Sequence, residues 1–124
     1  MTIIDVISRV DVLKPNGYKQ SEKVRWLSQL DLSVKNEIID THEGGENVVF
    51  EGYGDETPLD TVLLIPAPYD EAYIHYLEMK IDYFNREYGG YNNSLSMFEA
   101  EFDTFKKYYN REHTPISKGR RFLF

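Results

Sequence analysis

Residues 66–111 read PAPYDEAYIHYLEMKIDYFNREYGGYNNSLSMFEAEFDTFKKYYNR, and this stretch decides the fold. Apolar and aromatic side chains recur along it at steps of three and four residues, which places them on one face of an α-helix. The first stripe consists of Tyr69, Tyr73, Leu77, Ile81, Phe84 and Tyr88, and the second of Tyr91, Leu95, Phe98, Phe102, Phe105 and Tyr109. Because each stripe needs an apolar partner, the pattern predicts two helices packed as an antiparallel hairpin.

Proline and glycine predict the limits of these two helices. Pro66 and Pro68 favour a helix start directly after them. Gly89-Gly90 predicts the break, because glycine accepts the left-handed backbone that often ends a helix, and residues 92–94 offer caps for the next one. The alternative is one continuous helix, which would cost about 1 kcal/mol per glycine relative to alanine. Pro115 is expected to end the second helix.

Two further helices are expected upstream. Residues 3–13 carry an apolar stripe that Thr2 can cap, and a second stripe follows a candidate cap at Ser21 and runs to Gly44-Gly45. Residues 46–65 break the helical pattern and predict either a small β-hairpin or a long ordered loop.

These elements add up to one small all-α domain over residues 1–124, with about four helices and a long helical hairpin. A short β-hairpin in residues 46–65 would be the one non-helical element of this fold. Residues 112–124 read as an extended tail with basic and aromatic side chains.

Charge is distributed unevenly along the chain, whose formal net charge is −7. No Lys or Arg occurs between Lys35 and Lys80, whereas acidic residues accumulate there. They are Glu37, Asp40, Glu43, Glu46, Glu51, Asp55, Glu56 and Asp60. An acidic surface argues against tight duplex binding, which depends on Lys and Arg neutralising phosphates. No apolar run approaches the ~18 residues of a membrane span, and the first residues do not read as a signal peptide.

No catalytic, cofactor or metal site is predicted. The chain has no Cys, which excludes disulfides and thiolate chemistry, and it has no G-x-S-x-G or P-loop. His75 lies between Glu71 and Glu78 on a predicted helix, but the Glu-x-x-His pattern of di-iron bundles would need Glu where Ala72 stands. We therefore do not expect an enzyme.

The candidate functional residues are surface residues that could contact a partner. Some lie in the acidic loop, where aromatic and acidic side chains occur together, and the rest lie in the basic tail. They are Phe50, Tyr53, Asp55, Glu56, Lys118, Arg120, Arg121, Phe122 and Phe124.

Four short patterns follow one another along nearly the whole chain. They are RVDVLKPN at 9–16, KVRWLSQLD at 23–31, LIPAPYD at 64–70 leading into Tyr73, Tyr76-Leu77 and Ile81-Asp82, and YNNS at 91–94 followed by Met97-Phe98, Phe102 and YYNR at 108–111. In this order they resemble the small head–tail connector proteins (head completion or adaptor proteins) of tailed bacteriophages and prophages, especially those of low-GC Gram-positive hosts.

The resemblance implies an all-helical structural protein of the virion, assembled in the host cytoplasm without a cofactor or a membrane. Proteins of this family form a ring beneath the portal protein, continue the DNA channel and present a surface to tail-side completion proteins. DNA would pass through such a ring without specific binding, since lumen carboxylates repel phosphates. Residues 43–60 are the first candidates for that lumen.

Two other classes of function remain as alternatives. An acidic inhibitor that mimics DNA, or another regulatory inhibitor of phage origin, would use the net charge of −7. Its carboxylates should follow a long face at phosphate-like spacing, whereas both long predicted helices mix acids with Lys. A small enzyme of unrecognised type would need a pocket that gathers titratable groups with perturbed pKa values.

Overall fold

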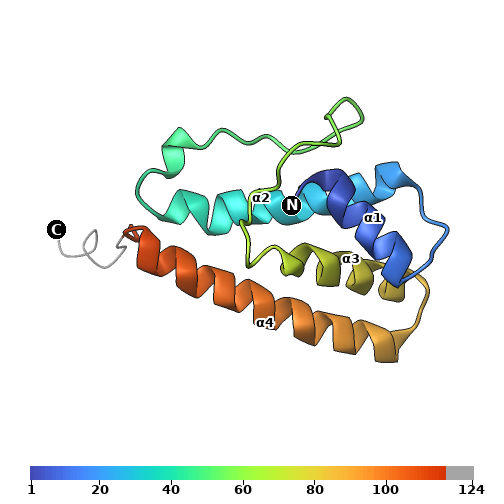
Figure 1. Cartoon of the computed structure of the whole chain (residues 1–124). Helices are drawn as coiled ribbons and strands as arrows, with labels where there is room; N and C mark the ends of the chain where they lie inside the picture. The colour runs from blue at the N-terminus through green and yellow to red at the C-terminus, as the bar shows by residue number, and fades with distance from the viewer. Residues whose placement is uncertain (117–124) are drawn as a thin grey trace.

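The computed structural model describes residues 1–116 and contains four α-helices in that range (Figure 1). They are α1 (Ile3–Leu13), α2 (Gln20–Glu37), α3 (Glu71–Phe84) and α4 (Tyr88–Glu112). Two short 3₁₀ helices, η1 (Ile39–Thr41) and η2 (Gly45–Asn47), follow α2. The prediction of a small all-α fold is confirmed. No helix within the described range is long and apolar enough to cross a membrane.

The core lies between the α3–α4 hairpin and the two N-terminal helices. Figure 1 shows α4 running antiparallel beneath α3, with α1 and α2 on the other side of α3. Tyr73, Leu77 and Ile81 of the α3 stripe are completely buried, and so is Phe105 of the α4 stripe. The hairpin predicted from residues 66–111 is therefore confirmed, and α3 is the element on which the other helices pack.

The break in the hairpin falls earlier than predicted. The turn lies between Phe84 and Tyr88 and contains Arg86 with φ of 60°, so residues 89–94 belong to α4 and do not cap it. Gly90 serves close packing, because a Cβ there would lie 2.9 Å from Oδ2 of buried Asp82.

The N-terminal helices agree with the prediction at α1 and differ at α2. Thr2 caps α1 in a reciprocal capping box with Asp5. Helix α2 begins at Gln20, so Ser21 is not its cap, and it ends at Glu37, well before Gly44-Gly45. The early end follows from Thr41, whose hydroxyl donates to the carbonyl oxygens of Glu37 and Ile38 and so satisfies acceptors at the helix terminus.

The long loop, residues 48–70, forms no β-hairpin, so the alternative of an ordered loop is the one found. Its second β-prone run pairs with the N-terminus through an isolated antiparallel bridge between Val62 and Thr2. The carbonyl oxygens of Thr61 and Leu59 accept hydrogen bonds from the amides of Ile3 and Ile4, at 3.0 and 2.9 Å. The first turn of a helix leaves these amides without an intrahelical acceptor. The loop therefore supplies the missing acceptors at the start of α1.

Candidate functional site

A buried carboxylate fixes the long loop against the helices. Asp31 of α2 is fully buried and accepts three hydrogen bonds, from the Tyr73 hydroxyl at 2.6 Å, the Tyr53 hydroxyl at 2.5 Å and the Leu64 amide at 3.1 Å. Burial raises the pKa of Asp31, and the three hydrogen bonds oppose that rise. Burial next to Asp31 also raises the pKa of Tyr53 and Tyr73, so both hydroxyls remain donors. The group is a structural anchor between α2, α3 and the loop.

This anchor determines how the four predicted interface residues of the loop are placed. Tyr53 is half-buried, and its amide also donates to the Ser28 hydroxyl at 2.9 Å. Phe50 lies edge-on to the Tyr53 ring with centroids 4.9 Å apart. Asp55 and Glu56 are exposed at the tip of the loop. The structure therefore brings Phe50 and Tyr53 together as a partly buried pair and leaves the two acids exposed.

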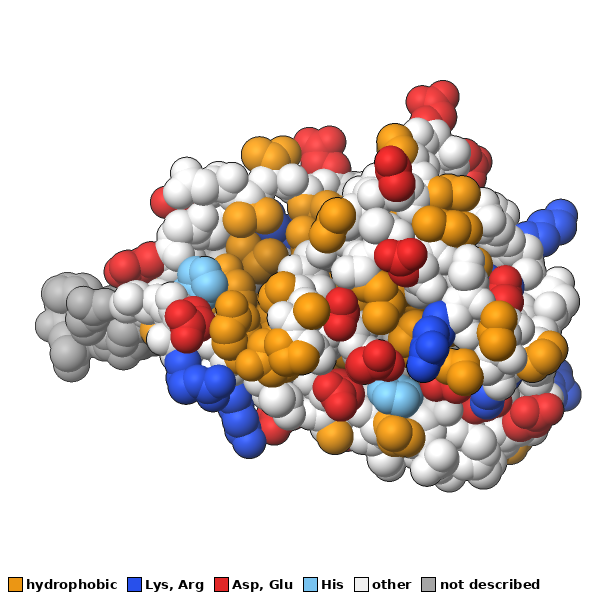
Figure 2. Space-filling model, viewed as in Figure 1, with side chains coloured by type: hydrophobic (Ala, Val, Ile, Leu, Met, Phe, Trp, Pro, Cys, Tyr) orange, Lys and Arg blue, Asp and Glu red, His pale blue; other side chains and the backbone are white. Residues whose placement is uncertain are grey.

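Residues 36–60, here called the acidic segment, present all eight of their carboxylates to solvent. Figure 2 shows acidic side chains along the side of the molecule that carries this segment. Lys35 forms an ion pair with Asp40 at its start. An unbroken series of exposed carboxylates produces a negative potential on this side of the protein.

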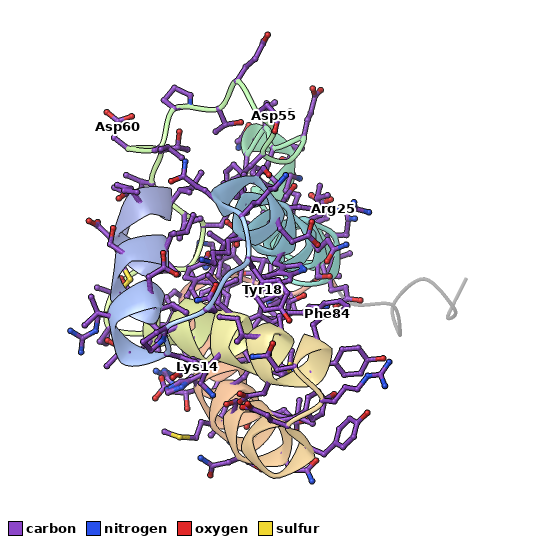
Figure 3. The ribbon with its side chains drawn as sticks, turned by 90° about the vertical axis from the view of Figure 1, so that its right-hand side faces the viewer. Lys14, Tyr18, Arg25, Asp55, Asp60 and Phe84 are labelled. Carbon is purple, nitrogen blue, oxygen red and sulfur yellow. The ribbon has the colours of Figure 1, made fainter. Side chains whose placement is uncertain are left out.

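A pocket lined by aromatic side chains opens at the end of the molecule where the α1–α2 and α3–α4 turns meet. Phe84 stacks on Trp26 with ring centroids 5.7 Å apart, and Tyr18 lies edge-on to Trp26 at 5.6 Å. The Tyr18 hydroxyl donates to the Asn85 side chain at 2.6 Å, which joins the two turns. Figure 3 looks onto this end, with Tyr18 and Phe84 next to each other. The cavity measures about 370 Å³, and Gly17, Lys19, Ser21 and Glu22 complete its lining.

The pocket belongs to a larger group of aromatic residues that we call the aromatic end. Phe84 is 50% exposed although it stacks on Trp26, and Tyr88 is 60% exposed. Tyr83 contacts Phe84 edge-on at 5.2 Å and Tyr91 at 5.7 Å. The members are Tyr18, Trp26, Tyr83, Phe84, Tyr88 and Tyr91. Exposed aromatic side chains grouped in this way are characteristic of surfaces that bind another protein.

A shallow groove continues from this pocket towards the tip of the long loop. Two smaller cavities, of about 240 and 160 Å³, lie between the first turn of α2 and residues 54–55. Ser21 lines all three cavities, Glu22 lines the first two and Asp55 lines the second and third. Arg25 is the cation beside Asp55. The aromatic pocket and the acidic tip of the loop are thus two ends of one surface.

Two histidines of the described chain, His75 and His42, make local contacts away from this surface. Within residues 1–116 no three His, Asp or Glu side chains are arranged to hold a metal ion. His75 contacts Glu78 at 3.2 Å on α3, and both side chains are partly buried. His42 is buried, and its ring nitrogens lie 2.6 Å from the Ile38 carbonyl oxygen and 2.6 Å from the Asn110 side-chain oxygen. These contacts connect the end of α2 to the end of α4.

The five predicted interface residues of the tail, Lys118, Arg120, Arg121, Phe122 and Phe124, lie outside the described residues. The chain that leads to them is fixed in place. Glu43 and Ile116 donate backbone hydrogen bonds to Thr114 and Thr41, each at 2.8 Å. The described chain therefore ends beside η1 and the end of α4, at the opposite end of α4 from the α3–α4 turn (Figure 1).

The aromatic pocket is the feature that sequence reasoning missed. Phe84 belongs to a predicted apolar stripe, Trp26 flanks another, and Tyr18 lies just after a predicted turn. Periodicity along one helix does not show which residues of two distant turns meet. The available signal was that the predicted stripe over residues 69–88 ends in aromatic side chains next to a predicted turn.

Comparisons of the chain with protein-family models, with curated proteins and with solved structures return no match.

Proposed function

We propose that this protein is a structural subunit of a virion, a head–tail connector that assembles as a ring between the portal protein and the tail-side completion proteins. The proposal starts from the ordered sequence patterns that resemble this family. It assigns the protein an assembly role with no catalytic centre, and DNA passes through the ring without specific binding.

The observation that carries the proposal is that the aromatic end and the last described residue, Ile116, lie at opposite ends of the molecule. The aromatic end lies at the α3–α4 turn, and the chain leaves beside η1 at the far end of α4. A subunit with different surfaces at its two ends forms head-to-tail contacts, and such contacts close into a ring when the rotation between neighbours permits. A ring of identical subunits needs this kind of asymmetry.

The acidic segment supports the same role. The six exposed carboxylates of its stretch from Glu43 to Asp60 would line the channel, where a negative wall repels DNA phosphates and lets the duplex slide. Changing these residues to Asn and Gln should slow or stall DNA ejection from particles, measured by dye release kinetics. Glu99→Gln with Asp103→Asn, on the exposed side of α4, is the matched control and should leave ejection unchanged. Identical ejection kinetics in all variants would exclude the acidic segment as the lumen.

The location of the protein tests the proposal itself. Particles produced from the genome that encodes the chain are purified, and antibody-gold against the chain is imaged by electron microscopy. The proposal predicts label at the joint between head and tail. Label on the capsid faces or the tail tip, or particles without label, would contradict it.

The same carboxylates favour a second candidate, an acidic inhibitor that mimics DNA. Residues 36–60 carry eight exposed acids and no Lys or Arg. An inhibitor would be found with a DNA-binding protein in cell extracts and would not remain with purified particles. The labelling experiment therefore separates the two candidates.

A further inference from the structure

We infer that the tail of one copy, residues 118–124, binds in the aromatic pocket of a second copy, with Phe122 or Phe124 inserted beside Trp26 and Phe84. The inference rests on the proposed function in one respect: it supplies the contact by which neighbouring copies associate in the ring.

Chain length favours a second copy as the occupant. The last described residue, Ile116, donates its amide to the Thr41 carbonyl just beyond α2, whereas Ser21 and Glu22 of the pocket lie at the start of α2. The 18 residues of α2 span about 27 Å at 1.5 Å per residue. Residues 117–124 reach about 28 Å when fully extended, but a relaxed chain of that length spans only about 16 Å. Binding within one chain would therefore require a fully extended tail, whereas a second copy can bind the tail without that extension.

The chemistry of the tail matches the pocket and the groove beyond it. A cavity of about 370 Å³ with Tyr18, Trp26 and Phe84 in its lining accepts an aromatic side chain. Arg121 precedes Phe122, so its guanidinium would come within reach of Glu22 at the rim. Lys19 and Arg25 also face this surface, which directs the tail cations towards Glu22 and Asp55.

Net charge favours the same pairing. The tail carries Lys118, Arg120 and Arg121 with no acid, whereas the whole chain has a formal net charge of −7. Two acidic bodies repel each other, and a basic segment that extends from one to the other reduces that repulsion.

A photo-cross-link on the full chain tests this contact. The photoreactive residue p-benzoylphenylalanine replaces Phe122, and ¹⁵N-labelled and unlabelled copies are mixed before irradiation. The expected product joins a tail of one isotope to a peptide of the other isotope that contains Tyr18, Trp26 or Phe84. Cross-links confined to a single isotopic chain, cross-links to another surface, or no cross-link would each overturn the inference.

A matched pair of glycine variants shows whether the pocket itself is needed. Gly17 lines the pocket and Gly89 does not, and a Cβ added at either position meets nothing within 4 Å. Gly17→Trp should fill the pocket and lower the yield of mixed-isotope product about tenfold, the loss typical of a central anchor. Gly89→Trp should leave the yield unchanged. Equal yields for both variants would refute the pocket as the binding site.

Sedimentation of the full chain provides a second readout that does not depend on the cross-linker. Phe122→Ser with Phe124→Ser changes only the tail, so the described fold is kept, and concentration-dependent association should be lost. Association that persists would overturn the inference. Because these experiments use purified protein, they are independent of particle assembly. The two proposals can therefore fail separately. Loss of the tail contact would leave the role in the virion untouched, and absence from the virion would leave the tail contact untouched.

Discussion

The Tyr73 hydroxyl donates a hydrogen bond of 2.6 Å to Asp31 Oδ1 and accepts one of 2.7 Å from the Ile65 amide. One side chain of α3 thus connects α2 to the end of the long loop, in a fully buried position. Both partners are buried polar groups that would lack a hydrogen bond without this hydroxyl. Removing the hydroxyl would therefore lower the stability of the fold by the cost of leaving buried polar groups unsatisfied.

Tyr73→Phe should therefore lower the free energy of unfolding by about 1–3 kcal/mol, because it leaves Asp31 Oδ1 and the Ile65 amide each without that partner. Tyr76→Phe is the control, since the Tyr76 ring packs on Phe98 at 5.2 Å and its hydroxyl is partly buried without a hydrogen-bond partner among the described residues. Urea denaturation measures both variants. Equal losses of stability would show that the Tyr73 hydroxyl has no special role.

Asp31 should make the free energy of unfolding depend on pH. Burial raises its pKa in the folded state, so the folded protein binds a proton more tightly than the unfolded chain. The wild type should lose stability relative to Asp31→Asn as the pH rises from about 3.9, the ordinary Asp value, through the raised pKa, and the difference should be constant above it. Chemical denaturation of both proteins over this range measures the difference. A wild type that gains stability relative to Asp31→Asn over the same range would mean that the pKa of Asp31 is lowered.

Adjacent glycines at the start of α4 should respond in opposite directions to the same substitution. Gly89→Ala meets open space and should stabilise the protein by up to about 1 kcal/mol, the helix propensity gain of alanine over glycine. Gly90→Ala should destabilise it, because the new Cβ would lie 2.9 Å from Asp82 Oδ2. Thermal melting followed by circular dichroism compares the two. A stabilising effect of Gly90→Ala would show that α4 does not pack this closely on Asp82.

The ion pair between Lys14 and Asp82 should matter far more than a similar pair on the surface. Lys14 Nζ lies 2.5 Å from Asp82, whose side chain is fully buried, so Lys14→Met would leave a buried carboxylate without its cation. We expect a loss of about 3 kcal/mol. Lys107→Met breaks an exposed pair with Asp103 and should change stability by less than about 0.5 kcal/mol.

The double variant Lys14→Met with Asp82→Asn completes the test of this pair. Its loss should be smaller than the sum of the two single losses, since the buried charge is removed together with its partner. Additive losses would indicate that the two residues do not interact in solution.

Local pattern predicted much of the fold, and contacts between distant residues explain where it failed. The steps of three and four residues predicted α1 and the α3–α4 hairpin because each helix must bury one face. Gly89-Gly90 has the composition of a helix stop, but Gly90 is needed for its packing on Asp82. The β-prone run that contains Val62 pairs with Thr2 through an antiparallel bridge. A local sequence pattern does not predict a contact between residues so far apart in the chain.

The candidate site was less predictable than the fold. The acidic segment follows from composition alone, and its exposure agrees with that reading. The sequence predicts that Tyr53 is a surface aromatic residue. Its hydroxyl instead donates a hydrogen bond to Asp31, which lies within the apolar stripe of α2. The aromatic pocket depends on two turns that are far apart in sequence, so only the folded arrangement reveals it.

Deletion of the coding sequence from the genome that carries it tests the central claim most directly. Particles made by the deletion strain are examined by negative-stain electron microscopy, and a plasmid copy restores the protein in a parallel culture. A head–tail connector predicts free tails beside heads that lack tails or have lost their DNA, with joined particles restored by the plasmid. Normal, infectious particles from the deletion strain would contradict the account and make the acidic inhibitor the leading candidate.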